Sequence, residues 1–391
     1  MRTQVGIVGG GPAGLLLSLL LQRAGIDCVV LESKSRDYLE SRVRAGVLEQ
    51  GTVALIDELG AGERLHREGM LDGRLDIRFD GGIIHIDLPV LTPGKIVTVY
   101  GQQEVVKDLI AARLARGGTI LFEAEASHIE GLTGDRPVIH FRHEGEAKIL
   151  ECDIVAGCDG FHGICRAAIP EDLLTVYDRI FPFGWLGILA ESKPFPEMSY
   201  SNHERGFSLA SRRSPTLSRL YVQCATDEDL AGWSDRRIWD ELQVRLYAKG
   251  GELVEGPILQ RGVTPCRAYV AAPMRYGRMF LAGDAVHIVP PTGAKGLNLA
   301  AADVRVLSRA LIEFFRTGAT ERLDRYSDSC LKRVWKGVRY SNYMTSLLHR
   351  FEAHTPFERR VQQAELEYVA GSLAARTTIA ENYVGLPFEE D

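Results

Sequence analysis

The chain opens with Met1-Arg-Thr-Gln-Val-Gly-Ile-Val-Gly9-Gly-Gly11-Pro-Ala-Gly14, and an apolar run over residues 15–22 follows without a break. This pattern predicts a short strand, a glycine turn and then a helix. Gly9 permits the tight turn, Gly11 lets the backbone approach a pyrophosphate, and Gly14 lets the helix pack closely on the strand. The free N–H groups and the positive dipole end of the helix would then face the phosphates.

A second apolar run, residues 28–31, follows the helix and ends at Glu32. A carboxylate at the end of that strand can accept hydrogen bonds from the hydroxyls of a ribose. A glycine turn by itself also occurs in ordinary α/β proteins. Strand, turn, helix, strand and terminal acid in this order predict a site for an adenine dinucleotide, with Ala13 in the turn beside the glycines.

The bulk composition is that of a globular protein and excludes several function classes. The 391 residues suggest two or three domains, and 45% hydrophobic and 25% charged residues are ordinary values. A net charge of −6 offers no basic surface to nucleic acid. The apolar run over residues 15–21 is too short to span a bilayer and lacks a signal-peptide cleavage site, so we expect no membrane contact and a cytoplasmic location.

Seven cysteines are scattered along the chain, and no two of them form a Cys-x-x-Cys pair. This spacing does not suit a zinc site, and disulfides are rare in the cytoplasm. We therefore expect the cysteines to be small buried side chains, with no metal site and no disulfide.

Two later stretches carry further cofactor signals. Asp159-Gly160 and Gly283-Asp284 each follow a predicted strand, which puts a turn and a carboxylate at the carboxyl edge of a sheet. Residues 293–298 then open a long helix whose free N–H groups suit a developing negative charge. A dehydrogenase that binds only a nicotinamide nucleotide needs the first signal alone. Three signals spread along the chain predict an extended cofactor, namely FAD.

The remaining pattern alternates between helices and strands. Residues 75–88, with Asp80-Gly-Gly in the middle, predict a hairpin. We expect a helix over residues 103–116, strands over 119–122, 138–143 and 149–155, a β-rich region over 181–269, and helices beyond Asp303. The predicted fold class is α/β: a Rossmann-like FAD-binding domain (1–178, with a β-hairpin excursion near 73–97), an inserted β-rich substrate domain (179–268), and a return to the first domain (269–300) before a helical C-terminal region (to 391).

A second hairpin is predicted within residues 208–223. Ser211 and Arg213 share one face of a strand, residues 214–217 form a turn, and Arg219 and Tyr221 share a face of the returning strand. An arginine flanked by hydroxyl groups suits a planar carboxylate, which a guanidinium binds with two parallel hydrogen bonds. A solvated hairpin with ordinary surface arginines is the alternative.

These features together resemble the class A FAD-dependent aromatic hydroxylases, and the likeness covers nearly the whole chain. Within that family, several stretches are similar to the branch that hydroxylates 4-hydroxybenzoate. They are Arg42-Val-Arg-Ala-Gly-Val-Leu-Glu-Gln50, Val99-Tyr-Gly-Gln102, Ala156-Gly-Cys-Asp-Gly-Phe-His-Gly163, His287-Ile-Val-Pro-Pro-Thr-Gly-Ala-Lys-Gly-Leu-Asn298 and Ile379-Ala-Glu-Asn-Tyr-Val-Gly-Leu-Pro387. The last two stretches are specific to that branch.

The resemblance implies a set of FAD-binding residues: Gly9, Gly11, Ala13, Gly14, Glu32, Arg42, Val43, Arg44, Ala45, Gly46, Val47, Gln102, Asp159, Asp284, Leu297 and Asn298. It also implies that the helix beginning near Gly293 points its positive end at the flavin and stabilises the anionic reduced form. A homodimer built on the C-terminal helices is implied as well.

The resemblance further implies the reaction, which belongs to aromatic compound catabolism: 4-hydroxybenzoate, NAD(P)H and O₂ would give 3,4-dihydroxybenzoate through a C4a-hydroperoxyflavin. Its substrate-binding residues match Tyr200, Ser211, Arg212, Arg213, Arg219, Tyr221 and Pro291 here, and its catalytic residues match Tyr200, Tyr383 and Pro291. A phenolate is far more reactive than a phenol towards an electrophilic oxygen. A hydrogen-bond chain from Tyr200 to Tyr383 would therefore carry the phenol proton away.

One position departs from the family. The proton relay of the family ends in a histidine, and Asp72 stands at the matching position here. An ordinary Asp has a pKa of about 3.9 and does not titrate near neutrality unless it is buried. We therefore expect the relay to leave the site by another route, for which His66 is a weak candidate.

The nucleotide preference is a further expectation from the resemblance. The matching nicotinamide-nucleotide residues are Ser33, Lys34, Tyr38, Arg42, Arg44, His162 and Arg267. Ser33 replaces an arginine of strongly NADPH-dependent members, while Asp37 and Glu40 dilute the positive field around a 2′-phosphate. We expect use of NADPH and NADH with loose discrimination. A hydroxylase of another carboxylated phenol and a catalytically silent ligand sensor remain alternatives.

Overall fold

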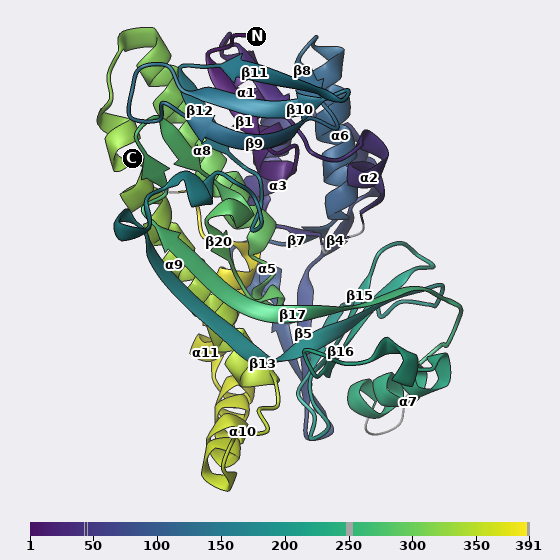
Figure 1. Cartoon of the computed structure of the whole chain (residues 1–391). Helices are drawn as coiled ribbons and strands as arrows, with labels where there is room; N and C mark the ends of the chain where they lie inside the picture. Colours follow the sequence, from purple (N-terminus) through teal and green to yellow (C-terminus); the bar gives the residue numbers. More distant parts are fainter. Residues whose placement is uncertain (43, 45, 248–252, 389–391) are drawn as a thin grey trace.

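The computed structural model describes residues 1–42, 44, 46–247 and 253–388, and it confirms the mixed α/β fold (Figure 1). Its first sheet has six strands, parallel except for the edge pair β18–β19. In order they are β18 (Arg275–Tyr276), β19 (Met279–Leu281), β12 (Ile154–Gly157), β1 (Val5–Val8), β2 (Cys28–Leu31) and β8 (Thr119–Leu121). Val5 pairs with Ile154 on one side and with Cys28 on the other, so the opening strand lies inside the sheet.

The apolar helix α1 (Pro12–Arg23) is buried because it packs between two other helices, α6 (Gln102–Ala115) and α8 (Gly296–Thr317). A small antiparallel sheet of β9 (Glu125–Glu130), β10 (Val138–His143) and β11 (Glu146–Glu151) covers the same domain. The prediction of one strand over 149–155 was wrong. The chain leaves β11 at Glu151 and enters β12 at Ile154, and the continuous apolar pattern hides this change of sheet.

The second large sheet has eight strands in the order β20-β17-β13-β16-β15-β14-β5-β6. Its long strands β13 (Thr175–Ala190) and β17 (Ile258–Ala272) run from the upper body into the lower one (Figure 1). The predicted hairpin near residue 80 is confirmed as β5 (Arg74–Phe79) and β6 (Gly82–Asp87), and it completes this sheet. The other strands are β14 (Met198–Ser201), β15 (Ser208–Arg212), β16 (Ser218–Cys224) and β20 (His287–Ile288).

Helix α7 (Asp235–Leu246) was missed inside the predicted β-rich region. Its buried residues Ile238, Trp239, Leu242 and Leu246 recur at helical spacing, so the signal was present in the sequence. The shorter elements are α2 (Arg36–Ser41), β3 (Val47–Leu48), α3 (Gln50–Glu58), α4 (Glu63–Glu68), β4 (Met70–Asp72), α5 (Leu88–Leu91) and β7 (Val97–Val99).

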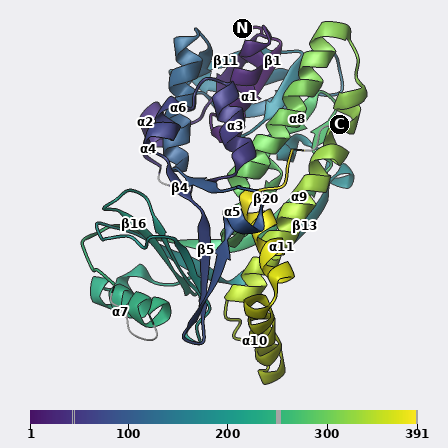
Figure 2. The same cartoon turned by 180° about the vertical axis from the view of Figure 1, so that it is seen from behind.

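The chain beyond Asp303 is mostly helical, as predicted. It contains α9 (Glu321–Leu348), α10 (Pro356–Gly371) and α11 (Leu373–Val384), and α10 projects away from the body (Figure 2). All seven cysteines are buried. Within the described ranges, no helix combines the length and the apolar character needed to cross a membrane.

Candidate active site

The opening glycine turn has the close contacts that the motif predicts. Gly9 has a φ of +105°, and a side chain there would meet the carbonyl oxygen of Cys158 at 2.3 Å. A Cβ at Gly14 would lie 2.0 Å from the carbonyl oxygen of Gly9, whereas a Cβ at Gly11 would meet only open space. No side chain caps the N-terminus of α1, which Ala13 helps to begin. The first-turn N–H groups therefore remain available to phosphate oxygens beside Gly11.

Glu32 is buried and braces this turn. One carboxylate oxygen accepts from the N–H of Gly10 at 2.6 Å and the other from the N–H of Lys34 at 2.8 Å. The oxygen bonded to Lys34 also accepts from the Ser33 hydroxyl at 3.4 Å, whereas the oxygen bonded to Gly10 keeps a second lone pair, which is what a ribose hydroxyl would need.

The two later carboxylates lie on turns at the edge of the same sheet. Asp159 accepts from the N–H of Cys165 through one oxygen, and its other oxygen is buried without a partner in the described structure. Burial raises the pKa of Asp159. Asp284 is half-exposed and lies 3.5 Å from Arg44, which brings the loop after α2 over the third signal. An orphaned oxygen on one turn and an accessible carboxylate on the other fit a polar ligand.

Asn298, in the first turn of α8, links this helix to the segment around Val47 and Glu49. Its side-chain oxygen accepts from the N–H of Glu49 (3.0 Å) and the hydroxyl of Thr52 (2.8 Å), and its NH₂ donates to the carbonyls of Val47 and Ala294. All its hydrogen-bonding capacity is thus used within the protein, so Asn298 shapes the site rather than meeting a ligand through its side chain.

The N-terminus of α8 itself is open. A Cβ at Gly296 would meet nothing, and the preceding Lys295 provides no side-chain cap. The free N–H groups beside Leu297 therefore suit the electron-rich edge of a flavin ring. Gly46 packs tightly on Tyr100, next to Gln102 at the start of α6. The predicted cofactor residues Val43 and Ala45 lie outside the described residues. The residues present fit FAD.

The second predicted hairpin is confirmed as β15 and β16, with Ser211 opposite Arg219 and Leu209 opposite Tyr221. Arg213 Nη1 lies 3.4 Å from Ser211 Oγ, and Arg219 Nε donates to the Tyr221 hydroxyl at 3.2 Å. Arg213 Nε is buried and has no hydrogen-bond partner among the described residues. Burial also lowers the pKa of Arg213. A half-buried guanidinium with an unused buried donor, and with no ion pair to a carboxylate among the described residues, fits an anionic ligand.

Arg212 lies apart from this group. Its Nη2 donates to the carbonyl oxygen of Leu71 at 2.6 Å and lies 3.9 Å from the carboxylate of Asp72. Successive residues of a strand face opposite sides, so Arg212 cannot share the face of Ser211 and Arg213. The structure therefore does not bring it together with the other predicted substrate residues.

The two predicted catalytic tyrosines are both buried. Tyr200 donates to the carbonyl oxygen of Thr292 at 3.1 Å, on the turn Pro291–Gly293. The Pro291 carbonyl itself accepts from the N–H of Ala294. Tyr383, at the end of α11, has no hydrogen-bond partner for its hydroxyl in the described chain. Burial raises the pKa of both phenols. The neighbouring Tyr200 raises the pKa of Tyr383 further, whereas Tyr383 lowers that of Tyr200.

Asp72 is 1% exposed, on β4. It accepts from the N–H groups of Met198 and Arg74, both at 3.3 Å. Burial raises its pKa from 3.8 to about 6. The condition under which an aspartate titrates near neutrality is therefore met here, which weakens the expectation that the relay must leave elsewhere. His66 is exposed and bonded to Asp57, 2.7 Å away.

The predicted nucleotide residues fall into two groups. On α2 and its flanks, the Arg42 guanidinium lies over the Tyr38 ring (5.7 Å), and Arg36 is hydrogen-bonded to Glu40 at 2.5 Å. Ser33 and Lys34, which precede α2, are hydrogen-bonded to Glu32. On the other side, the rings of His162 and Phe161 meet edge to face, and Arg267 lies 4.6 Å over Phe161. Arg267 is also bonded to both oxygens of Asp178.

The sequence interpretation missed two groups that organise the site. Arg166 donates to the carbonyls of Ala285 (2.7 Å) and Phe161 (2.6 Å) and so joins the two carboxylate turns. Asp303 accepts from the N–H of Gly283 and from His287. A lone arginine carries no pattern, but an acid on the apolar face of a predicted helix was a usable signal.

Comparisons with known proteins agree with this geometry. The sequence matches the family described as FAD binding domain over residues 2–341. It is 49% identical over 391 residues to p-hydroxybenzoate hydroxylase of Acinetobacter baylyi, covering 100% of this chain and 96% of that protein. It is 28% identical over 344 residues to para-nitrophenol 4-monooxygenase of a Pseudomonas species, covering 82% of this chain and 81% of the relative.

The crystal structure of p-nitrophenol 4-monooxygenase from Pseudomonas putida has the same fold, with a TM-score of 0.85 at 22% identity. The match covers 98% of this chain and 99% of that one. Fold, cofactor turns and sequence agree from end to end, and the chain belongs to the p-hydroxybenzoate hydroxylase family of FAD-dependent aromatic monooxygenases.

Proposed function

We propose that this monooxygenase hydroxylates 4-hydroxybenzoate at the carbon beside its phenol, giving 3,4-dihydroxybenzoate in the breakdown of aromatic compounds. The 49% identical relative named p-hydroxybenzoate hydroxylase supports this substrate. The observation that carries the proposal is the half-buried Arg213, whose buried Nε lacks a partner in the described residues and which lies beside Ser211 and Tyr221. A benzoate carboxylate would satisfy that donor and balance the positive charge of the guanidinium.

The phenol end of the substrate would lie at Tyr200, whose hydroxyl meets the turn that contains Pro291. We assign Tyr200 and Tyr383 the task of holding and removing the phenol proton, with the Pro291 carbonyl facing the same hydroxyl. Both side chains are almost fully buried, and this exclusion of water protects a reactive oxygen species from wasteful decay. When bound, FAD accepts hydride from NAD(P)H and activates dioxygen.

The cofactor and nucleotide contacts are part of the same proposal. FAD would lie against the glycine turn, Glu32, the loop 42–47, Gln102, Asp159, Asp284 and the α8 N-terminus at Leu297 and Asn298. NADPH or NADH would use Ser33, Lys34, Tyr38, Arg42, Arg44, His162 and Arg267. Because Arg36 is tied to Glu40, less positive charge remains for a 2′-phosphate, which supports loose discrimination between the two nucleotides.

The test follows NADPH and NADH oxidation by the purified FAD-loaded protein with and without 4-hydroxybenzoate, and quantifies 3,4-dihydroxybenzoate formed. We expect strong stimulation by the substrate and close to one product per nucleotide. If 4-hydroxybenzoate stimulates nucleotide oxidation but hydrogen peroxide forms instead of 3,4-dihydroxybenzoate, then 4-hydroxybenzoate is a mimic and another carboxylated phenol is the substrate. No stimulation would contradict the proposal.

We also propose a cytoplasmic homodimer. Helix α10 projects from the body, and Phe357, Val361, Tyr368 and Leu373 on α10 and α11 are 53–76% exposed (Figure 2). Large apolar side chains gathered on a projecting element mark an interface, here with a second copy. Sedimentation should give twice the mass of the chain, and Val361→Asp should shift it to monomer. A wild-type protein that sediments with the mass of one chain would exclude the dimer.

A further inference from the structure

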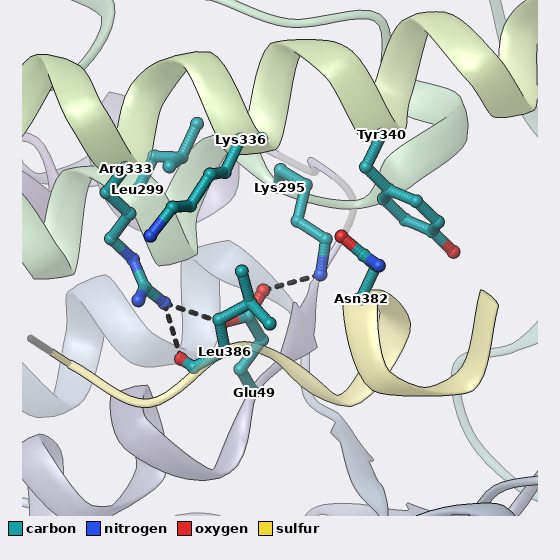
Figure 3. A pocket seen from close by; sticks show the side chains of 9 residues that line it. Glu49, Lys295, Leu299, Arg333, Lys336, Tyr340, Asn382 and Leu386 are labelled. Carbon is teal, nitrogen blue, oxygen red and sulfur yellow. Dashed lines mark hydrogen bonds and ion pairs between the residues drawn. The ribbon is translucent and has the colours of Figure 1, made fainter. Parts of the chain in front are cut away.

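The C-terminal segment after Tyr383 crosses a buried cluster of charges (Figure 3). Arg333, on α9, donates to the carbonyl oxygen of Pro387 at 2.7 Å and to that of Leu386 at 3.0 Å. Its guanidinium also lies over the Phe388 ring, 5.1 Å from the ring centre. One side chain of the long helix thus binds two successive backbone carbonyls of the segment.

The carboxylate of Glu49 connects this contact to the start of α8. One of its oxygens accepts from Lys295 Nζ at 2.5 Å, and the other lies 3.3 Å from Arg333 Nη2. Lys295 Nζ donates as well to the carbonyl oxygen of Tyr383, at 3.2 Å. Glu49 and Lys295 are about 95% buried, so water screens these interactions little.

At Gly385 the backbone of the C-terminal segment turns and passes close to the carboxylate of Glu49. Its φ is +97°, and a Cβ there would lie 2.2 Å from a carboxylate oxygen of Glu49. Only glycine has both the backbone freedom and the missing side chain that this passage requires. The backbone from Tyr383 to Pro387 is therefore fixed at three carbonyls and one turn, whereas the Tyr383 hydroxyl has no hydrogen bond to any described residue.

We infer that Arg333 is a positioning residue for substrate deprotonation: with Gly385 and Glu49 it holds the C-terminal segment as a strap that fixes Tyr383 in the active site. This inference rests on the proposed function for the role of Tyr383, but the strap itself does not. Since the Tyr383 hydroxyl has no hydrogen-bond partner among the described residues, side-chain packing and the backbone that carries Tyr383 set its position. Small displacements of groups around a reacting atom have large effects on rate.

Three variants test the strap in different ways. Arg333→Gln removes both the positive charge and the paired hydrogen bonds to the carbonyls of Leu386 and Pro387. Arg333→Lys keeps the charge next to Glu49 but cannot bind two carbonyls in a fixed fork. Gly385→Ala keeps every charge and pushes the segment away from Glu49. The matched controls are Arg325→Gln, an exposed arginine of the same helix, and Gly318→Ala, a glycine with a φ of +79° and open space around it.

The first measurement is hydrogen–deuterium exchange of residues 379–385 in the FAD-loaded protein without substrate. We expect exchange to be about tenfold faster or more in all three variants and unchanged in both controls. Unchanged exchange in the variants would overturn the strap, whatever the substrate proves to be.

The second measurement is the phenol pKa of bound 4-hydroxybenzoate, read from its absorbance. We expect a rise of about one unit in all three variants, and therefore about tenfold less phenolate below that pKa. A shift in Arg333→Gln alone would mean that only the charge matters, and it would overturn the positioning role. Failure of the wild type to ionise or hydroxylate this phenol would overturn the proposed function, and the exchange result would still decide the strap.

Discussion

The cofactor turns and the substrate pocket are built in opposite ways. Around β1 and α1, the contacts that matter are made by the backbone: Gly14 against Gly9, Gly9 against the carbonyl of Cys158, and an uncapped helix N-terminus. Around Tyr200, the contacts come from distant parts of the chain, because β14 pairs with β5 from the first hundred residues and Tyr200 donates to Thr292.

This difference determines what substitution can do in each region. A backbone turn offers no alternative packing, so one added methyl group has nowhere to go. A pocket assembled from side chains loses one interaction at a time, and its remaining groups stay in place. We therefore expect abrupt failure in the first region and graded losses in the second.

The largest effect should come from Gly9→Ala. Its Cβ would meet the Cys158 carbonyl at 2.3 Å in a backbone of positive φ, so we expect loss of FAD and a cost of about 3 kcal/mol or more in unfolding free energy. Gly25→Ala is the control, with positive φ and open space, and should cost about 1 kcal/mol. For both variants, flavin absorbance measures the bound FAD and urea unfolding measures the unfolding free energy. Retention of FAD by Gly9→Ala would break the comparison.

Arg213→Ala comes next. Losing a half-buried charged donor to a carboxylate should cost about 3 kcal/mol, on the order of a hundredfold in kcat/KM for 4-hydroxybenzoate. The protein should keep its FAD, since the hairpin is remote from the glycine turn. Steady-state kinetics with Arg212→Ala as the neighbouring control should show a loss of less than about fivefold. Equal losses in the two variants would argue against a carboxylate at Arg213.

Asp72→Asn should have a pH-dependent effect. The folded pKa of about 6 is above the ordinary 3.8, mainly because of burial, so the folded protein binds more protons between these values. The unfolding free energy of the wild type should therefore fall as pH rises through this window, by about 2 kcal/mol, and stay level above it. The difference between wild type and Asp72→Asn in urea unfolding from pH 4 to 7.5 measures this. A constant difference would contradict the assignment.

The same variant tests the relay. If protons leave the site through Asp72, the ionisation of bound 4-hydroxybenzoate should show a group near 6 that disappears in Asp72→Asn. Persistence of that group would support another exit.

The smallest effect should come from Glu40→Gln on α2. Freeing Arg36 from its carboxylate adds positive field near the predicted 2′-phosphate position and should raise the NADPH/NADH ratio of kcat/KM by about two- to fivefold. The exposed pair Arg325–Glu321 offers the control, Glu321→Gln, which should leave the ratio unchanged. A shift in the control would mean that only net charge matters.

The sequence by itself determined the parts that depend on local geometry. The opening strand, turn and helix, the hairpin β5–β6 and the hairpin β15–β16 all follow from glycine positions and alternation over short windows. The long likeness to one family then supplied the cofactor and the reaction, and the comparisons agree.

Tertiary structure alone decided what depends on burial and on distant neighbours. It separated β11 from β12, turned Arg212 away from Arg213, and buried Asp72 so that its pKa rises to about 6. It also placed Arg333 on the carbonyls of a segment some fifty residues further along the chain. Residue type gives a side chain its ordinary properties, but solvent exclusion and the partners that the fold brings within bonding distance set its charge and its task.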